Sequence, residues 1–316
     1  MCYKCHSFVC SRSYTYTLLN LFEYVVVLKI YNHIFINRTI IMNRLYLLIN
    51  SFTILTSCFF YGQNSSFIYE HRYISDSTNR KVINTEIMTL SVNKDRSEFY
   101  SMDKFKSDST LLVESKKGVF MMPPNKLMNS DRVRKQLQST TIDYITIISN
   151  SKYLVSQNII LEWNILQEFD NILGYRTQKA RTEFGGRKWI AWFTKEISIQ
   201  DGPYKFYGLP GLILKIEDIG KNHTFELKGI RKTAVNFVYP ELGNFKLFKI
   251  SNSKYEKIFK NYRKYPIADL AGTFPDYTNS TGVLISGRET ERLEEKRRKD
   301  QIKKDNNIIE LNLLKK

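Results

Sequence analysis

Residues 207–214 read Tyr207-Gly208-Leu209-Pro210-Gly211-Leu212-Ile213-Leu214, which places two glycines and a proline directly before an apolar run. Proline holds φ at about −65° and glycine accepts a positive φ, so residues 209–212 predict a type II turn. Gly208 lets the backbone bend without a Cβ in the way. The following residues alternate as a strand at 212–217, which turns back through 218–223 into a second strand at 224–230. The stretch therefore predicts a rigid corner that begins a β-hairpin.

A second hairpin precedes this corner, because Gly185-Gly186 separates two alternating segments at 178–184 and 187–194. Two adjacent glycines supply the positive φ angles that a tight two-residue turn requires. In the second segment both faces are largely apolar, with Trp189, Ala191 and Phe193 on one side and Ile190, Trp192 and Thr194 on the other. We therefore expect that strand to be covered on both faces.

Short alternating segments separated by polar turns continue through the rest of the chain after Ser66. Further strands are predicted at 67–73, 86–92, 97–102, 111–114, 119–122, 144–149, 153–157 and 247–250. Residues 123–140 predict a surface excursion, and residues 254–265 predict an amphipathic helix that Ser253 caps and Pro266 ends. No pattern indicates a parallel crossover. The expected fold is β-rich (α+β), with a single curved antiparallel sheet or half-open barrel and one or two peripheral helices.

The first 62 residues differ from the rest in composition. They contain all four cysteines, Cys2, Cys5, Cys10 and Cys58, and a single acidic residue, Glu23. From Met42 a short basic segment, an apolar run and Gly62 follow one another, as in a secretory signal peptide. We therefore predict an overlong gene-model start at 1–41, a signal peptide at 42–62, a single β-rich domain at 63–287 and a charged C-terminal helix or tail at 288–316.

Two alternatives stay open at this end of the chain. A membrane anchor at 15–41 competes with the overlong start, although Glu23, Lys29 and Asn32 interrupt the roughly 20 apolar residues that a span needs. Residues 55–58 have the small-residue-then-cysteine pattern of lipoprotein processing, which would tether the protein by lipid. We expect an exported, periplasmic or outer-membrane associated protein without a transmembrane span in the mature chain, with a lipoprotein anchored at Cys58 as the alternative.

The composition restricts the classes of partner. Lysine and arginine number 48 against 31 acidic residues, so the formal net charge is +17. These basic residues are scattered along an exported chain, which favours a solvated basic surface or an acidic envelope partner over nucleic acid. No cysteine follows Cys58, so the mature domain relies on packing rather than on disulfides.

A set of motifs in fixed order resembles the GLPGLI family of exported Bacteroidetes proteins. The matching residues are Gly174-Tyr175, Lys179-Ala180, Phe184, Gly186-Arg187, 191–194, Ile197, 202–206, 208–213 and the closing stretch 306–311. Thr177 stands where members of the family often carry a cysteine, so no role of that thiol transfers to this chain. The resemblance implies an exported protein without an established activity.

Catalytic motifs are absent from the mature sequence. It contains no thiol, no Gly-x-Ser-x-Gly, no His-Glu-x-x-His and no glycine-rich phosphate loop, and we expect no catalytic residue, metal or cofactor. Of its two histidines, His71 is expected to be packed or at the rim of a strand face, and His223 to be exposed in a turn. A carboxylate-pair hydrolase, for instance with Asp201 and Glu217, is the less favoured alternative because such pairs leave no sequence signature.

Binding is therefore the favoured function, with a lipid-like ligand or an outer-membrane protein as partner. We select Arg187, Trp192, Asp201 and Tyr204 as candidate ligand or partner residues, and Gly185, Gly186, Gly208, Pro210 and Gly211 as structural turn residues. The first hypothesis is a concave sheet face that holds an apolar or amphiphilic ligand. The second is an accessory component of an outer-membrane assembly, in which residues 201–204 and the corner present a rigid surface to a partner.

Overall fold

The computed structural model describes residues 64–123, 129–136, 139–233, 237–243 and 246–315, together with Lys29 alone. The chain divides into two units, Met1–Gly62 and Gln63–Lys316, and only the second is described as a fold. The predicted start codon, signal peptide and lipid anchor lie outside the described residues and stay predictions. Among the residues that the structure describes, no helix has both the length and the apolar character that a membrane span requires.

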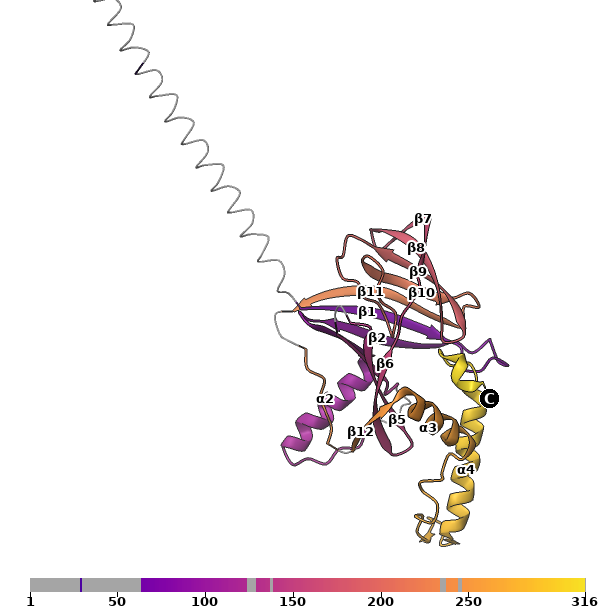
Figure 1. Cartoon of the computed structure of the whole chain (residues 1–316). Helices are drawn as coiled ribbons and strands as arrows, with labels where there is room; N and C mark the ends of the chain where they lie inside the picture. Colours follow the sequence, from indigo (N-terminus) through magenta and orange to yellow (C-terminus); the bar gives the residue numbers. More distant parts are fainter. Residues whose placement is uncertain are drawn as a thin grey trace, which may run out of the picture. The chain divides into compact units, whose positions relative to one another are not determined.

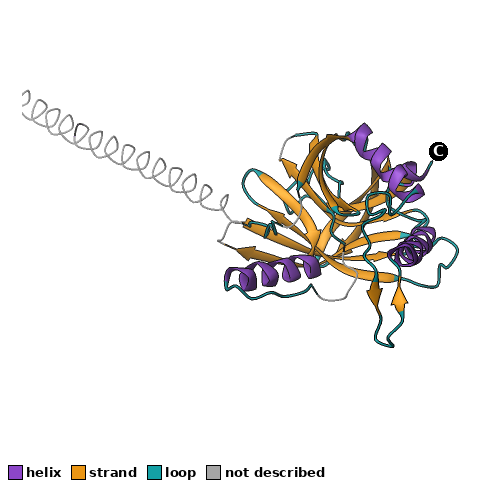
Figure 2. Ribbon diagram, turned by 90° about the horizontal axis from the view of Figure 1, so that it is seen from below, coloured by secondary structure: helices purple, strands orange, loops and turns teal. Residues whose placement is uncertain are grey.

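Twelve strands form one strongly curved sheet in the order β12-β6-β5-β4-β3-β2-β1-β11-β10-β9-β8-β7 (Figures 1 and 2). Their bounds are β1 Asn64–Tyr73, β2 Asn84–Val92, β3 Arg96–Ser101, β4 Arg132–Gln136, β5 Thr141–Ile148, β6 Ser151–Asn158, β7 Asn164–Ile172, β8 Tyr175–Phe184, β9 Arg187–Thr194, β10 Leu212–Asp218, β11 His223–Thr233 and β12 Leu247–Ser251. In the described part of the chain the edge strands β7 and β12 are not paired with each other, so the sheet stays open. The predicted β-rich fold with a single curved sheet is confirmed.

One pair of strands is parallel, contrary to the all-antiparallel prediction. The strand β12 runs parallel to β6, with Leu247 opposite Lys152 and Ser251 opposite Ser156. The other neighbouring pairs in the sheet are antiparallel. Periodicity in a five-residue segment indicates a strand but carries no information about its direction, which is why the sequence did not predict this pairing.

Three α-helices lie at the periphery of the sheet in the described residues, one more than predicted: α2 Met102–Lys116, α3 Asn252–Lys264 and α4 Gly287–Lys304 (Figure 2). A short 3-10 helix, η2, follows at Leu311–Leu314, and two short strands, β13 Tyr277–Thr278 and β14 Leu284–Ile285, pair with each other. The helix α3 agrees with the prediction except for its cap. The hydroxyl of Ser251, rather than that of Ser253, accepts from the Lys254 N–H.

The helix α2 replaces a predicted hairpin. Residues 111–114 were predicted as a strand, but they continue the helix that the Ser101 hydroxyl caps by accepting from the Lys104 N–H. Residues 119–122, the predicted partner strand, are exposed and irregular. Ser101 with Asp103 in the first turn is a helix-start signal, and it outweighs the short apolar run at 111–113.

The strand β4 was not predicted, because charged residues interrupt its alternation. The strand β4 lies inside the predicted surface excursion at 123–140, yet Arg132 and Lys135 are buried in it. Each has an acidic partner, since Arg132 pairs with Glu98 and Lys135 with Asp201. The sequence does not distinguish a charged residue that is paired inside the fold from one that is solvated. The charged residues of this buried strand therefore led to the prediction of a surface segment.

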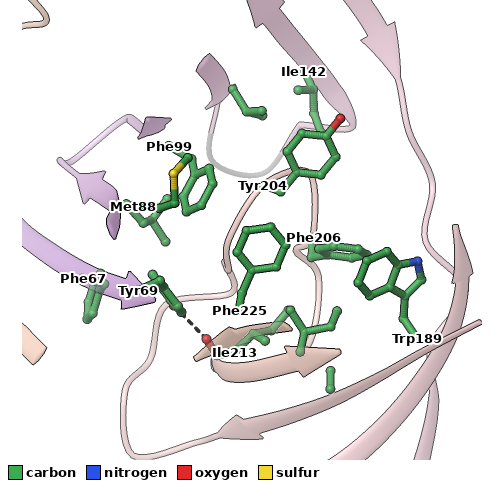
Figure 3. Packing of buried hydrophobic residues seen from close by; sticks show 14 of the residues in the cluster. Phe67, Tyr69, Met88, Phe99, Ile142, Trp189, Tyr204, Phe206, Ile213 and Phe225 are labelled. Atoms are coloured by element: carbon green, nitrogen blue, oxygen red, sulfur yellow. Dashed lines mark hydrogen bonds between the residues drawn. The ribbon is translucent and has the colours of Figure 1, made fainter. Parts of the chain in front are cut away.

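The core lies inside the curve of the sheet and contains aromatic side chains from distant strands (Figure 3). Tyr69 of β1 contacts Phe99 of β3 edge to face at 6.3 Å between ring centroids, and its hydroxyl donates to the Ile213 carbonyl at 2.7 Å. Trp189 of β9 packs on Phe206 at 4.7 Å. On β9 the outward side chains Lys188, Ile190 and Trp192 are exposed or half-buried, so the prediction that both faces are fully covered is only partly right.

The corner at 207–214 leads into β10 as predicted, but its turn is not type II. The Gly211 N–H lies 2.7 Å from the Leu209 carbonyl, whereas the Leu212 N–H donates to Ile197 at 3.2 Å instead of to Leu209. Pro210 is therefore the centre of a three-residue γ-turn. A Cβ on Gly211 would lie 1.9 Å from the Thr194 carbonyl oxygen, so close approach of β9, together with a φ of +145°, is what requires glycine there.

Candidate functional site

A pocket of about 310 Å³ opens at the end of the sheet where β1 finishes and β11 begins. Its wall combines apolar and polar groups. The lining residues are His71, Tyr73, Ser75, Asn129, Asp131, Tyr144, Tyr204, His223, Tyr255, Phe259, Asp305, Asn307, Ile308, Ile309, Glu310 and Leu313. A concave site with an apolar part and a few fixed polar groups is the usual form of a small-molecule site.

One wall of the pocket is the C-terminal segment, which we define as residues 305–314. It follows α4 and lies across the ends of the strands, where the Asn307 N–H donates to the Ser75 carbonyl and the Asn312 N–H to Gly185. Asn307 and Leu313 are buried. The exposed helix α4 agrees with the predicted charged tail at 288–316, but the residues after it are part of the packed domain.

Arg187 holds this segment in place. Its guanidinium donates to the carbonyls of Asn307 at 3.1 Å, Ile308 at 2.7 Å and Ile309 at 3.1 Å. The same group pairs with Asp218 at 3.2 Å, and both side chains are buried. Burial lowers the pKa of Arg187, while Asp218 acts in the opposite direction. Arg187, selected from the sequence as a binding residue, does not itself line the pocket and positions the segment that does.

Two carboxyl groups in the pocket are bound to tyrosine hydroxyls. Asp131 accepts from the Tyr144 hydroxyl and from the Thr146 hydroxyl, each at 2.7 Å. Glu310 accepts from the Tyr204 hydroxyl at 2.6 Å and pairs with the ammonium of Lys205. Burial raises the pKa of Asp131 above its usual value, against the effect of these hydrogen bonds. Tyr204 is thus the selected binding residue that the structure places in the pocket, and burial raises its pKa well above the usual value.

Lys205 lies behind this wall and is completely buried. Its ammonium is 4.1 Å from the centroid of the Tyr144 ring and 5.1 Å from that of Tyr204. Aromatic faces attract cations, and Glu310 supplies the opposite charge, so both stabilise the buried ammonium. The charge of Glu310 is thereby neutralised within the protein.

The two histidines lie side by side in the pocket wall. The prediction that His71 is packed is confirmed, because it is 4% exposed and stacks on Phe225 at 4.0 Å between ring centroids. The prediction that His223 is exposed is wrong, because it is 3% exposed and its Nε2 lies 2.7 Å from the Asn307 carbonyl oxygen. Burial lowers the pKa of His223 to about 4 and that of His71 well below its usual value. Both rings are therefore neutral at pH 7.

The remaining selected residues lie away from the pocket lining. Asp201 is buried beside Lys135, and its Oδ2 has no hydrogen-bond partner in the described structure. Trp192 is half-buried on the outer side of β9, with the Lys179 ammonium 5.6 Å from its ring centroid. The carboxylates named for a hydrolase, Asp201 and Glu217, do not line the pocket.

The corner and residues 201–206 offer little surface to a partner protein. Residues 201–206 are all buried, and so is Leu209, while Gly208 and Pro210 are exposed. The predicted presentation of a rigid loop surface at 201–204 is therefore wrong. Of the turn residues, Gly185 and Gly186 do form the predicted hairpin turn, with φ angles of +62° and +79°, and Gly208 has a φ of +91°.

Several pocket residues were not selected from the sequence. Asp131 lies in the run that was read as a surface excursion, and Glu310 in the region that was read as a tail. The closing stretch 306–311 was nevertheless part of the pattern that resembles the GLPGLI family. That resemblance was the feature of the sequence that could have led to Asn307 and Glu310 as site residues. In the described residues no group of three or more histidine, cysteine, aspartate or glutamate side chains is placed to hold a metal ion.

The fold and the pocket define a β-rich protein with one open, curved sheet and a mixed polar and apolar cavity at one end. The family model described as "Protein of unknown function (Porph_ging)" matches residues 176–215, from β8 to the start of β10. No curated protein matches the chain significantly. Two solved structures, "Structure of PNGF-II in P21 space group" and "Structure of PNGF-II in C2 space group", are similar with a TM-score of 0.46 and 18% identity. Each match covers 64% of this chain, which spans about a third of those two chains, 34% and 33% respectively.

Proposed function

We propose that this chain is an exported envelope protein that binds a small amphiphilic ligand in the pocket and has no catalytic activity of its own. The observation that carries this proposal is the lining of the 310 Å³ pocket. Phe259, Ile308, Ile309 and Leu313 supply an apolar surface, and hydroxyl, carboxyl and imidazole groups lie in the same cavity. Such a pocket suits a molecule with an apolar part and a polar head.

Family and localisation belong to the same proposal. The motifs at 174–213 resemble the GLPGLI family, and the family model of unknown function matches the overlapping residues 176–215. The signal-peptide pattern before Gln63 supports export to the periplasm or the outer membrane. A lipid anchor on Cys58 is the alternative mode of attachment, and N-terminal sequencing of the mature protein distinguishes the two.

A carboxylate-based hydrolase is the second candidate, and one observation favours it. Asp131, Asp305 and Glu310 converge on the pocket, and burial raises the pKa of Asp131 and of Asp305. A carboxyl group with a raised pKa is a candidate general acid. Against this role, Asp131 is fixed by two hydroxyl donors, and Asp305 pairs with Arg263.

The proposal is tested by purifying the protein from its native envelope and identifying co-purified small molecules by mass spectrometry. We expect an amphiphile that is lost in Ile309→Trp, because the indole fills the pocket, and retained in Phe169→Trp on the exposed edge strand β7. Equal retention by both variants, or no bound molecule together with no binding of added amphiphiles, would contradict the proposal.

A further inference from the structure

The histidine pair leaves one imidazole nitrogen as an unpaired acceptor. His223 Nε2 lies 2.7 Å from the Asn307 carbonyl oxygen, which can only accept, so Nε2 carries the proton. His223 is neutral, and its Nδ1 is therefore an acceptor. His71 Nε2, 3.3 Å from that Nδ1, must then be the donor of the contact. Because His71 is neutral as well, its Nδ1 is unprotonated.

That Nδ1 is buried and has no hydrogen-bond partner among the described residues. His71 is 4% exposed and is one of the residues that line the pocket. A buried acceptor without a donor costs free energy, so a ligand that offers this atom an N–H or O–H group gains free energy. The rings of Tyr73 and Phe225 stack on His71 at 4.7 Å and 4.0 Å and fix the plane in which its lone pair points.

The charges in the pocket wall also favour a ligand that donates hydrogen bonds. Three carboxyl groups line the pocket, and no lysine or arginine does so among the described residues. Glu310 is neutralised by Lys205 and Asp305 by Arg263. Asp131 forms no ion pair among the described residues and accepts from the hydroxyls of Tyr144 and Thr146, while Lys205 acts on it only as a more distant cation. Asp131 is also half-buried rather than sealed off, so a molecule in the pocket can approach it.

Several donors in the wall are already used inside the protein. The Tyr144 and Tyr204 hydroxyls donate to Asp131 and Glu310. The side-chain amide of Asn307 donates to the Ile74 carbonyl at 2.7 Å. An anionic ligand would thus meet three carboxyl groups and no lysine or arginine among the described lining residues, whereas a ligand that donates finds free lone pairs.

We infer that the polar head of the ligand is a hydrogen-bond donor, an amine or a polyhydroxyl group, that binds Asp131 and the Nδ1 of His71, and that anionic heads are excluded. This inference rests on the proposed function. An amine and a polyhydroxyl group have in common an N–H or O–H group that donates to these acceptors. The apolar part of the ligand packs on Phe259, Ile308, Ile309 and Leu313.

Three probes with the same tail test the inference: octylammonium, octyl glucoside and octyl phosphate, titrated into the purified mature protein at pH 7.5 by calorimetry below their micelle concentrations. We expect octylammonium or octyl glucoside to bind at least tenfold more tightly than octyl phosphate. The comparison of the first two decides between an amine and a polyol. It needs no variant, so it does not depend on a substitution that unfolds the protein.

Variants then locate the effect. Asp131→Asn replaces one acceptor by a donor of the same size, and we expect it to reduce the preference for the donor probe over octyl phosphate at least tenfold. Asp143→Asn, a carboxyl group outside the pocket that accepts from Ser156, is the matched control and should keep the preference. Tighter binding of octyl phosphate, blocked by Ile309→Trp, would overturn the inference and leave the pocket as a binding site. Failure of all three probes to bind would count against the proposed function itself.

Discussion

The backbone of Glu310 passes so close to Gly185 that a Cβ on this glycine would lie 2.9 Å from the Glu310 Cα. Gly186 has a similar neighbour, because its Cβ would lie 3.3 Å from the Asn312 nitrogen. The C-terminal segment therefore packs directly against the hairpin turn between β8 and β9. The two glycines serve the turn through their positive φ and the pocket through the absence of side chains.

Gly185→Ala should destabilise the protein by at least about 2 kcal/mol, because a left-handed φ and a backbone clash add together. Gly174→Ala is the matched control, since Gly174 has a φ of +82° but nothing within 4 Å of its Cβ position, and we expect a cost of about 1 kcal/mol. Urea unfolding measures both. Hydrogen exchange should show faster exchange in residues 306–314 for Gly185→Ala alone, and equal behaviour of the two variants would contradict the role of the close approach.

Arg187→Met removes the donors to the C-terminal segment and leaves Asp218 buried without its cation. Loss of one partner of a buried ion pair costs about 3 to 5 kcal/mol. The neighbouring Lys188→Met breaks an exposed pair with Glu183 and should cost less than about 1 kcal/mol. Both values come from urea unfolding, and a cost for Arg187→Met as small as that for Lys188→Met would show that the segment is held by other contacts.

Gly211→Ala tests the corner that begins β10. Its Cβ would meet the Thr194 carbonyl oxygen at 1.9 Å, so β9 and the corner must separate, and we expect a loss above about 4 kcal/mol or no folded protein. Gly229→Ala in β11 has nothing within 4 Å of its Cβ and no strained φ, so its effect should stay within about 1 kcal/mol in either direction. Thermal unfolding followed by circular dichroism separates these outcomes, and a stable Gly211→Ala variant would refute the close approach.

Local chemistry made most of the sheet predictable. The glycine pair at 185–186 and the corner at 207–214 predicted the hairpins that contain β8 to β11. Turn residues determine the conformation of only the few residues around them, so a short stretch of sequence is enough to predict a turn. The strand β4 was not predictable in this way, since Arg132 and Lys135 are buried by partners more than thirty residues away. Their burial is a property of the assembled sheet.

The pocket was harder to predict from the sequence, because its residues too are brought together by contacts between distant parts of the chain. Tyr204 was selected for its place in an aromatic motif, and it does line the cavity. His223 was misjudged because a histidine beside Asn222 in a turn looks exposed, and its burial depends on Asn307, 84 residues further along the chain. The closing residues looked like a tail because their charged neighbour α4 is exposed, whereas their docking site, Gly185 and Arg187, lies far upstream.

Acid should destabilise the protein through its buried histidines. The pKa of His223 is about 4 in the folded state against an ordinary value of 6.5, so the unfolded chain binds the proton first. The stability that the neutral ring provides is complete above pH 6.5 and is lost as the pH falls from 6.5 to about 4. Its upper limit is about 3 kcal/mol, from a shift of about 2.5 units at 1.36 kcal/mol each. Asp131 acts with the opposite sign, because its raised pKa makes the folded state bind a proton more readily than the unfolded state as the pH falls towards 4.

The free energy of unfolding in urea should therefore be lower at pH 4.5 than at pH 7. His223→Gln keeps a side-chain N–H near the position of Nε2 and the Asn307 carbonyl but does not titrate, so it should reduce this difference. His71 and the ion-paired Glu226, Glu241 and Glu294, whose pKa values are lowered, account for the part that is left. Asp143→Asn, whose side chain lies outside the pocket, is the control and should leave the difference unchanged. A pH dependence that is the same in His223→Gln as in the wild type would show that the ring is not buried in its neutral form.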